Sequence, residues 1–408
     1  MKKIVYIAST FILLLVAFIA CEDKPEVYEF PKDKFFYEIP EVPVTEDYVV
    51  GVPYEVKTRD AKQGVWLVDK KAQSYTGTPI HGEYDLRVEE DFLKQQMEWG
   101  KQAGIDFFII SWGGHGLNDT ILSNYEKWYQ PGHPQVVIRF DPGYRFPKSV
   151  KDTLMLNQVQ MDSLRIDFDS VYTSVMTKNY AYKNRNTGNP VMVLTNFTNS
   201  ANIPSTSKFT EFLRTAVNNK VWIMAELGGR LTSPERWGFH AANGYSNAFV
   251  DGYVQPDSIK AFDAFFITDV STDNKDRYDA LYSLTDYNFR YWQSKMQSAG
   301  KEYVPTIMPA FDNLINDAKS NTYLIPRWNA ETNSAYVVSA EKTKTEYNFS
   351  NIQKNPYQEF ANVAKRNVGP SRILIVYNWN DYANGINLEP TVEFGDDYLK
   401  YTKQFFKK

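Results

Sequence analysis

The sequence is poor in cysteine and histidine, with one cysteine and four histidines in 408 residues. A single cysteine rules out an internal disulfide framework. The same scarcity rules out zinc sites built from several cysteines. No D-x-D-x-D-G run indicates a calcium loop, so the sequence predicts neither a metal site nor a cofactor.

An excess of positive charge is also missing. The chain carries 45 Lys and Arg against 49 Asp and Glu, which gives a formal net charge of -4. Proteins that bind the phosphate backbone need a basic surface, so nucleic acid is not predicted as a partner. The motifs G-x-S-x-G and H-E-x-x-H are absent too, which removes the usual sequence support for serine hydrolases and zincin proteases.

Apolar and aromatic residues are plentiful. Hydrophobic residues make up 43% of the chain and aromatic residues 15%, so the protein can bury a large core and is not disordered. The length allows two or three domains, but it equally allows one large α/β barrel.

The first twenty residues have the pattern of a signal peptide. Lys2 and Lys3 precede an apolar run over residues 4–20, which is slightly short for a stable membrane span. The run ends in F-I-A-C, and its last residue is Cys21. This ending resembles the lipobox of bacterial lipoproteins, in which the cysteine is lipidated and becomes the first mature residue. An uncleaved membrane anchor is the alternative.

Residues 21–47 are rich in Pro, Glu, Asp and Lys, which predicts a tether that lifts the following domain from a membrane. Glu22 and Asp23 resemble the export signal of surface lipoproteins in the Bacteroides group. The N-terminus therefore predicts a protein of the cell envelope. A lipid would anchor it to the outer membrane, facing either the periplasm or the cell surface.

From residue 48 to 408 the sequence repeats one theme, in which a short β-branched and aromatic run ends in a polar or glycine cluster and leads into helical periodicity. Most runs are apolar throughout, as expected for parallel strands that are covered on both faces. Eight runs have this form: residues 48–54, 105–111, 135–141, 190–196, 221–226, 264–269, 303–308 and 372–378.

Helical periodicity is clearest at residues 88–103, 279–298, 357–366 and 396–406. Eight strands with helices between them predict an α/β fold, a single (β/α)8 barrel over residues 48–408. A doubly wound open sheet is the alternative, but it does not require eight strands and usually carries a glycine-rich phosphate turn. The long polar segment 314–355 predicts a loop that is inserted after strand seven, over the active site.

In such a barrel the chemistry lies at the carboxyl ends of the strands. Acidic and aromatic residues dominate these ends, which suits sugars, because rings stack on pyranose faces and a carboxylate pair cleaves glycosidic bonds. We expect about half of the acids only to cap the following helix. The strand-end residues are Glu55, Trp112, His115, Asp141, Asn196, Glu226, Asp269, Asp312, Asn313, Trp379, Asn380 and Asp381.

A resemblance to a known family narrows the predicted function. Residues 377–390 read Y-N-W-N-D-Y-A-N-G-I-N-L-E-P. They resemble the W-N-E-W-x-E-G-x-x-x-E-P motif at strand eight of the glycoside hydrolase family 99 endo-α-mannosidases and their WbsX-like relatives. Residues 83–87 (E-Y-D-L-R) and 104–108 (G-I-D-F-F) resemble the start of that group, and Asp312 with Asn313 resembles its W-D-N element.

The resemblance implies a retaining hydrolase of α-linked glycans in which two glutamates of the motif act on one sugar. The first removes the proton of the 2-hydroxyl, and the second protonates the leaving oxygen. These two positions fall on Asp381 and Asn384. Asp381 keeps a carboxylate on a shorter stem, but Asn384 cannot donate a proton as an acid. Losing general acid catalysis typically costs about 10² to 10⁴ in rate.

An active enzyme therefore needs another acid. Glu226 is the first candidate, because its apolar flank and the following glycines favour the protonated form. Asp141 and Asp312 are second candidates, although Arg139 favours an ionised Asp141. Substrate contacts are predicted for Trp112, His115, Asp141, Asp312, Asn313, Trp379, Tyr382 and Glu389, the last with a structural role as its alternative.

Three functions stay open from the sequence. The first is an exported glycosidase acting on an oligosaccharide or polysaccharide. The second is a catalytically silent barrel that captures glycans at the cell surface. The third is a WbsX-type glycosyltransferase, although an exported lipoprotein meets few nucleotide sugars.

Overall fold

The computed structural model describes most of the chain from Tyr37 onward. Cys21, His115, Asn196, Asp269 and Asn313 lie outside the described residues. The described residues are 37–59, 62, 66–68, 71–72, 75–114, 116–142, 158–195, 206–227, 262–267, 281–312, 324–340, 344 and 348–408.

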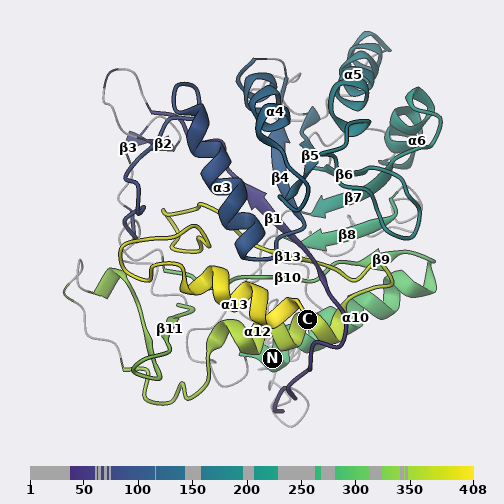
Figure 1. Cartoon of the computed structure of the whole chain (residues 1–408). Coiled ribbons are helices and arrows are strands. Elements are labelled where there is room, and N and C mark those ends of the chain that lie inside the picture. The colour runs from purple at the N-terminus through teal and green to yellow at the C-terminus, as the bar shows by residue number, and fades with distance from the viewer. Residues whose placement is uncertain are drawn as a thin grey trace, which may run out of the picture.

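The centre of the molecule is one parallel sheet (Figure 1). Its strands run in the order β10-β13-β1-β4-β5-β6-β7-β8-β9. The strands are β1 (Val49–Tyr54), β4 (Phe107–Trp112), β5 (Gln135–Phe140), β6 (Val191–Leu194), β7 (Trp222–Leu227), β8 (Ala264–Ile267), β9 (Glu302–Tyr303), β10 (Thr306–Ile307) and β13 (Ile373–Val376).

The two ends of this order meet, because β9 and β10 are two parts of one extended segment, residues 302–307. Its first part pairs with β8 and its second part pairs with β13. Between the two parts, Val304 N donates to Phe265 O at 2.7 Å and Pro305 O accepts from Ile375 N at 2.8 Å. The sheet therefore closes with eight strands, and the predicted (β/α)8 barrel is confirmed.

Helices follow the strands and cover the outside of the barrel (Figure 1). The four helices predicted from periodicity are present, with ends shifted by a few residues. The described helices are α3 (Glu90–Gln102), α4 (Leu117–Trp128), α5 (Gln158–Val171) with the π-helical turn η2 (Tyr172–Met176), α6 (Thr206–Ala216), α10 (Leu281–Ser298), α12 (Pro356–Asn367) and α13 (Asp397–Phe406).

Local sequence explains where these helices begin and end. The side chain of Asn355 accepts a hydrogen bond from Tyr357 N at 3.0 Å, and Pro356 occupies the first turn of α12, where no backbone donor is needed. After α3 the chain reverses at Gly104, whose φ of 68° is easily adopted only by glycine.

Two short hairpins lie outside the barrel. β2 (Leu67–Val68) pairs with β3 (Lys71–Ala72) after the first strand. β11 (Arg327–Asn329) pairs with β12 (Ser334–Tyr336) between β10 and α12. The second hairpin belongs to the insertion that the sequence predicts after strand seven.

Side chains alternate between the inside and the outside of the barrel along each strand. Inside, a cluster that includes Phe107, Val137, Met224 and Ile375 fills the barrel. The residues in between, such as Phe108, belong to a larger cluster with the helices. Continuing each alternation past the inner cluster identifies the residues that face the carboxyl-terminal opening, which we call the mouth. They are Glu55, Ser111, Arg139, Thr195, Glu226 and Tyr377.

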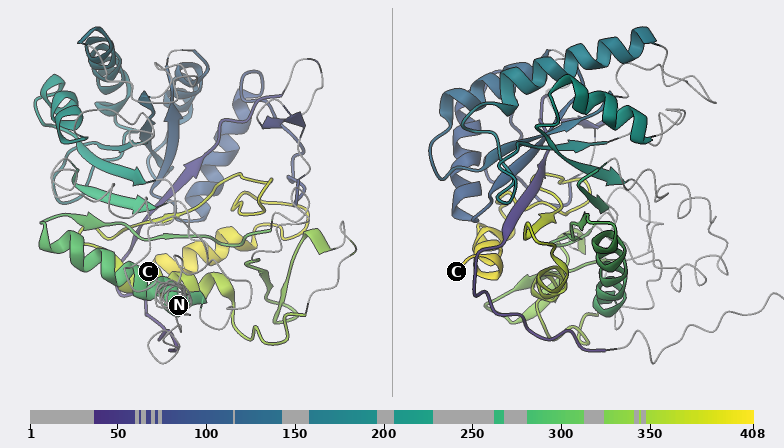
Figure 2. Two further views of the ribbon diagram at one scale, coloured as in Figure 1. Left: turned by 180° about the vertical axis from the view of Figure 1, so that it is seen from behind. Right: turned by 90° about the vertical axis from the view of Figure 1, so that its right-hand side faces the viewer.

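The first described residues, 37–48, form an N-terminal strap along α10 and α12 (Figure 2). The hydroxyl of Tyr37 lies 2.8 Å from Asp286 Oδ2 in the first turns of α10. Further along, Lys365 Nζ donates to Val42 O at 2.6 Å. This part of the predicted tether therefore packs on the barrel. No helix of the described chain is long and apolar enough to cross a bilayer.

Gly51 tests the packing of the barrel interior. A Cβ at this position would overlap the Phe107 ring and approach Ile375 Cδ1 to 2.8 Å. We expect Gly51→Ala to lower the free energy of unfolding by about 1–3 kcal/mol, because overpacking a filled core displaces side chains. Chemical denaturation measures the loss. Gly77→Ala is the control, since its φ is not positive either and the atom nearest to the added Cβ, Thr391 Cγ2, lies 3.2 Å away. An equal loss in both variants would show that the overlap with Phe107 is not the cause.

Candidate functional site

The mouth contains one strong ion pair, between Arg139 of β5 and Glu226 of β7. Arg139 Nη2 donates to Glu226 Oε1 at 2.8 Å, and Arg139 Nε donates to Glu226 Oε2. Arg139 also donates to Ser111 Oγ and to Thr195 Oγ1, both at 3.2 Å. Such a two-bond pair occupies both carboxylate oxygens of Glu226 and fixes their direction. The structure therefore corrects the expectation of an apolar flank at Glu226, because this residue faces a guanidinium and is engaged in an ion pair.

A second carboxylate, Glu55, follows β1. The side chain of Asn380 holds its backbone from both sides: Asn380 Oδ1 accepts from Glu55 N at 2.9 Å, and Asn380 Nδ2 donates to Glu55 O at 2.8 Å. Just before these bonds, Trp379 N donates to Pro53 O at 2.9 Å. Because Asn380 precedes Asp381, these bonds bring Glu55 beside Asp381.

Asp381 lies in the tight turn after β13 and is 8% exposed. Both of its carboxylate oxygens accept hydrogen bonds from one residue: Asn384 N donates to Oδ1 at 3.1 Å, and Asn384 Nδ2 donates to Oδ2 at 2.8 Å. Asn384, which replaces the acid of the resembled motif, thus orients the carboxylate of Asp381 through both of its oxygens.

The surroundings of Glu55 raise the pKa of its carboxyl group. The surrounding protein displaces water from its carboxyl group, which raises its pKa, and the negative charge of Asp381 raises it further. Lys57, whose Nζ lies 2.5 Å from Glu55 Oε2, and Arg139 oppose this shift without cancelling it. The side chain is 40% exposed, so it remains accessible from the mouth. Burial and the neighbouring charge thus raise the pKa of Glu55, whereas both oxygens of Asp381 are held by hydrogen bonds from Asn384.

Tyr377 adds a neutral hydroxyl to this group of charges. It occupies the inward-facing position after β13. Burial raises its pKa above the usual range, and the charges of Glu226, Asp381 and Glu55 raise it further, whereas Arg139 lowers it. The phenol stays protonated at every physiological pH and can donate a hydrogen bond to a ligand oxygen.

Three aromatic residues predicted to stack on sugars lie elsewhere. Trp112 is 1% exposed and stacks on Phe140 in the layer between sheet and helices. Trp379 is fully buried, and its Nε1 donates to Gln96 Oε1 at 3.1 Å. Tyr382 is also fully buried, against Trp66. Stacking needs an exposed ring face, so these predictions are wrong: Trp112 takes an outward-facing position in β4, under the helices, and Trp379 and Tyr382 lie in the turn after β13 and pack into the core.

Asp312 has a structural place as well. It is 3% exposed, and its Oδ2 accepts from Ser339 N at 2.8 Å. Its backbone N donates to Asn384 O at 2.8 Å. Asp312 therefore joins the insertion after strand seven to the turn of Asp381 and is no candidate acid. Asp141 lies at the rim after β5, where its charge acts on Arg139.

Glu389 is buried below the turn of Asp381, with 1% exposure. Its carboxyl oxygens accept hydrogen bonds from Tyr84 Oη at 3.0 Å and from Gln96 Nε2 at 3.2 Å. Burial outweighs these bonds and raises its pKa to about 8. Tyr84 Oη also accepts from Asn380 Nδ2 at 2.9 Å. Glu389 therefore supports Asn380 through Tyr84 and does not contact substrate, which corrects its predicted binding role.

The sequence places Glu55 at a strand end without indicating a catalytic role, and it does not indicate Lys57, Arg139 or Tyr377 as site residues. Three of them follow from strand alternation. Once Val49, Val137 and Ile375 are placed inside the barrel, every second residue after them faces the mouth. Lys57 has no such signal. Among the described residues, no group of three His, Cys, Asp or Glu is arranged to hold a metal ion.

The buried Glu389 predicts a pH-dependent stability. Its pKa is raised in the folded state, so the folded protein binds this proton more tightly, and stability falls as pH rises toward the folded pKa of about 8. Relative to Glu389→Gln, the wild type should lose up to ~4 kcal/mol of unfolding free energy between pH 5 and pH 8. Urea denaturation across this range measures the difference. Glu331→Gln, at an exposed turn position, is the control, and parallel curves for wild type and Glu389→Gln would contradict the prediction.

Comparisons with known proteins agree with this architecture. The barrel is similar to a solved "Glycoside hydrolase-like protein", with 19% identity and a TM-score of 0.66 over 93% of this chain and 100% of that one. It is also similar to the GH99 endo-α-mannosidase of Bacteroides thetaiotaomicron, with 13% identity and a TM-score of 0.53 over 89% of this chain and 97% of that one. These likenesses show a shared fold. None of the curated proteins matches the sequence.

A family model supplies the assignment. It matches residues 76–402, which include β4 to β13 and the turns of Asp381 and Glu389. The match and the shared fold confirm the resemblance found in the sequence and support a role in glycan processing. The chain belongs to the family described as "Glycosyltransferase WbsX".

Proposed function

We propose that the protein is a glycosidase that cleaves α-linked glycans with Asp381 as the base and Glu55 as the general acid. One observation carries this proposal: Asn380 fixes Glu55 beside Asp381, where burial and the charge of Asp381 raise the pKa of Glu55, while Asn384 orients the Asp381 carboxylate. Two carboxylates whose proton affinities are pushed apart are the chemical requirement for glycosidic cleavage. The α-linkage follows from the strand-eight resemblance, and the similarity of the fold to an endo-α-mannosidase agrees with it.

In the first step that the resemblance implies, Asp381 takes the proton of the sugar 2-hydroxyl. The 2-oxygen then bonds to the anomeric carbon while the glycosidic C–O bond breaks. Glu55 donates its proton to the departing oxygen. In the second step the ionised Glu55 takes a proton from water, whose oxygen bonds to the anomeric carbon. The bond to the 2-oxygen breaks, and that oxygen recovers its proton from Asp381. Atoms and charges balance, and the anomeric configuration is retained.

The other residues of the mouth bind and orient the sugar. The Tyr377 hydroxyl is a neutral donor between the carboxylates. The Arg139–Glu226 pair presents fixed charges opposite Glu55 and holds Ser111 and Thr195 in place. Lys57 attracts the carboxylate that Glu55 becomes after it has given up its proton, which stabilises the charge produced by the reaction.

Glycosyl transfer is the second candidate, and the family description favours it. It uses the same two carboxylates, with a sugar hydroxyl in place of water in the second step. Incubation with a glycan donor alone or with an added acceptor separates the two, because hydrolysis releases reducing ends and transfer lengthens the acceptor. Binding of glycan without either product would instead support the silent barrel that Asn384 brought into consideration.

The two carboxylates predict different mutant kinetics. Glu55→Gln should lower kcat about 10²- to 10⁴-fold on a natural glycan, because the leaving oxygen needs a proton. It should change kcat little on an activated aryl glycoside, whose leaving group departs without protonation. Asp381→Asn should abolish turnover of both substrates. Reducing-end and chromogenic assays measure these rates, with Glu331→Gln as the matched control. Equal losses of Glu55→Gln on both substrates would remove Glu55 from the acid role.

The raised pKa of Glu55 also sets the pH profile. The acid must be protonated, so kcat should fall as pH rises through this pKa. In Glu55→Gln this alkaline limb should disappear, while the acidic limb, which requires an ionised Asp381, should stay. A profile of kcat against pH from about 4 to 9 covers both limbs. An alkaline limb that persists in Glu55→Gln would assign the acid to another residue.

We also propose that residues 1–20 are removed on export and that lipidated Cys21 anchors the protein to the outer membrane. The charged and apolar pattern of these residues and the F-I-A-C ending support it. A glycosidase at this place would act on polysaccharide outside the cytoplasm.

Cys21→Ser tests the anchor in a Gram-negative host. The wild type should enter the detergent phase on Triton X-114 partition, and mass spectrometry should find acyl chains on Cys21 and no peptide from residues 1–20. Cys21→Ser should lack the acyl chains and move to the aqueous phase if it is cleaved. An unmodified Cys21 in a chain that still begins at residue 1 would show the uncleaved membrane anchor instead.

A further inference from the structure

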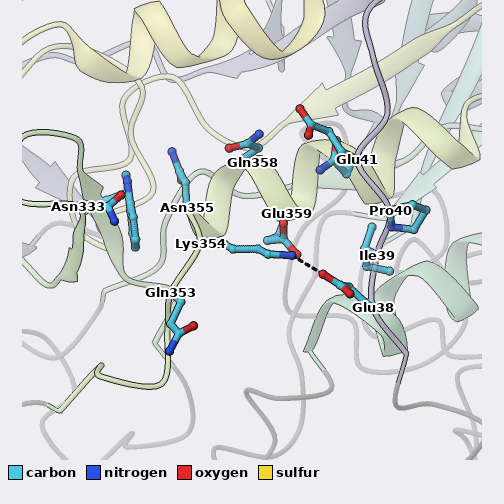
Figure 3. Close-up of a pocket in the computed structure, with 12 residues that line it drawn as sticks. Glu38, Ile39, Pro40, Glu41, Asn333, Gln353, Lys354, Asn355, Gln358 and Glu359 are labelled. Atoms are coloured by element: carbon cyan, nitrogen blue, oxygen red, sulfur yellow. Dashed lines mark hydrogen bonds and ion pairs between the residues drawn. The ribbon is translucent and has the colours of Figure 1, made fainter.

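A polar cavity of about 620 Å³ lies on the flank of the barrel, where the N-terminal strap crosses the first turns of α12 (Figure 3). Three parts of the chain line it: the strap, the β11–β12 hairpin and the start of α12. None of the mouth residues contributes, so this cavity is separate from the site of Glu55 and Asp381. Its lining comprises Glu38, Ile39, Pro40, Glu41, Trp328, Asn333, Gln353, Lys354, Asn355, Gln358, Glu359 and Asn362.

Side-chain amides are the most frequent group in this lining. Asn333, Gln353 and Gln358 make no side-chain hydrogen bond to any described residue. Asn355 and Asn362 use only their carbonyl oxygens on the protein, which accept from Tyr357 N at 3.0 Å and from Val42 N at 3.2 Å. The cavity therefore offers donors and acceptors in about equal number. Each primary amide can bind one hydroxyl as a donor and another as an acceptor.

The charge of the lining restricts the ligand further. Lys354 Nζ lies 2.6 Å from Glu38 Oε1, so this pair is neutral overall. Glu41 and Glu359 have no ion-pair partner among the described residues. Burial raises the pKa of Glu359, and the charges of Glu38 and Glu41 raise it further, against the opposing charge of Lys354. A cavity with surplus negative charge repels phosphates, sulfates and uronates.

The lining also excludes two other occupants. The three glutamates are not arranged to hold a metal ion within the described chain. An apolar ligand would cover the three amides that make no side-chain hydrogen bond, the Nδ2 groups of Asn355 and Asn362 and two carboxyl groups without offering any of them a partner, which is costly in a partly enclosed space. A neutral molecule with many hydroxyl groups satisfies donors and acceptors together, and the cavity volume is in the range that holds small organic ligands.

We propose that this cavity is an ancillary binding site for a neutral oligosaccharide. It holds a segment of glycan on the flank of the barrel, at a place where no cleavage occurs. Strand β11, which contributes Trp328 to the lining, also contacts the loop that follows Asp381. Arg327, which precedes Trp328 in β11, donates to Gly385 O and Asn387 O at 3.0 Å, in the loop that follows Asp381. The β11–β12 hairpin thus contacts both the ancillary site and the loop that follows Asp381.

Isothermal titration calorimetry on the full chain carrying Asp381→Asn tests the site. The probes are mannohexaose, maltohexaose, cellohexaose and xylohexaose, with oligogalacturonate and chitosan hexamer as charged counterparts. Gln358→Trp fills the cavity from the exposed side of α12, and Gln353→Ala removes one amide. Gln102→Trp and Gln102→Ala, at an exposed position in α3, are the matched controls. Thermal melting verifies that each variant is folded.

At least one neutral hexasaccharide should bind, and Gln358→Trp should remove one equivalent of it per chain. Gln353→Ala should weaken this equivalent about two- to tenfold, as expected for one lost hydrogen bond. Both Gln102 variants should bind as the parent does. The proposal is overturned if no neutral hexasaccharide binds, if Gln358→Trp keeps the full stoichiometry, or if only the charged probes bind. If the mouth binds no glycan, the parent and all variants lose the same equivalent. The test therefore distinguishes failure of the proposed catalytic site from failure of the ancillary site.

Discussion

The pairing of the first strand with the last is the constraint on which this molecule depends. β1 and β13 are more than 300 residues apart in the chain, yet they lie side by side in register, Val49 with Ile373. The side chain of Asn380 extends this pairing beyond the end of the ladder by bonding both backbone groups of Glu55. Closing the barrel and assembling the carboxylate pair are therefore one event. A chain that failed to bring its ends together would have neither.

The three carboxylates at the mouth have different neighbours. Asp381 accepts two hydrogen bonds from Asn384 in its own turn, whereas Glu55 is near the negative charge of Asp381 and is partly shielded from water. Glu226, at the end of β7, forms a fixed ion pair with Arg139. The three carboxylates therefore have three different surroundings, although they face the same opening of the barrel.

Hydrophobic runs and helical periodicity were sufficient to predict the eight strands, four of the helices and the barrel, because parallel strands buried on both faces leave a strong local signal. The strand-eight motif likewise predicted the family and the place of Asp381. Orientation was harder: Trp112 ends β4 but faces the helices, and Trp379, three residues after the end of β13, packs into the core. Contacts between distant strands leave no local signal in the sequence. The ion pair of Glu226 with Arg139 could therefore not be predicted from the residues next to Glu226.

The start of the N-terminal strap and the C-terminus lie at opposite ends of the barrel. α10 ends just before β9 begins, so its first turns, where Tyr37 is held by Asp286, lie at the same end of the barrel as the mouth. The other terminus is at the opposite end, where Lys407 Nζ donates to Tyr48 O at 2.6 Å (Figure 2). A group attached to Tyr37 would therefore lie near a polymer that enters the mouth. A fusion partner joined after Lys408 would lie at the opposite end of the barrel and leave the entrance unobstructed.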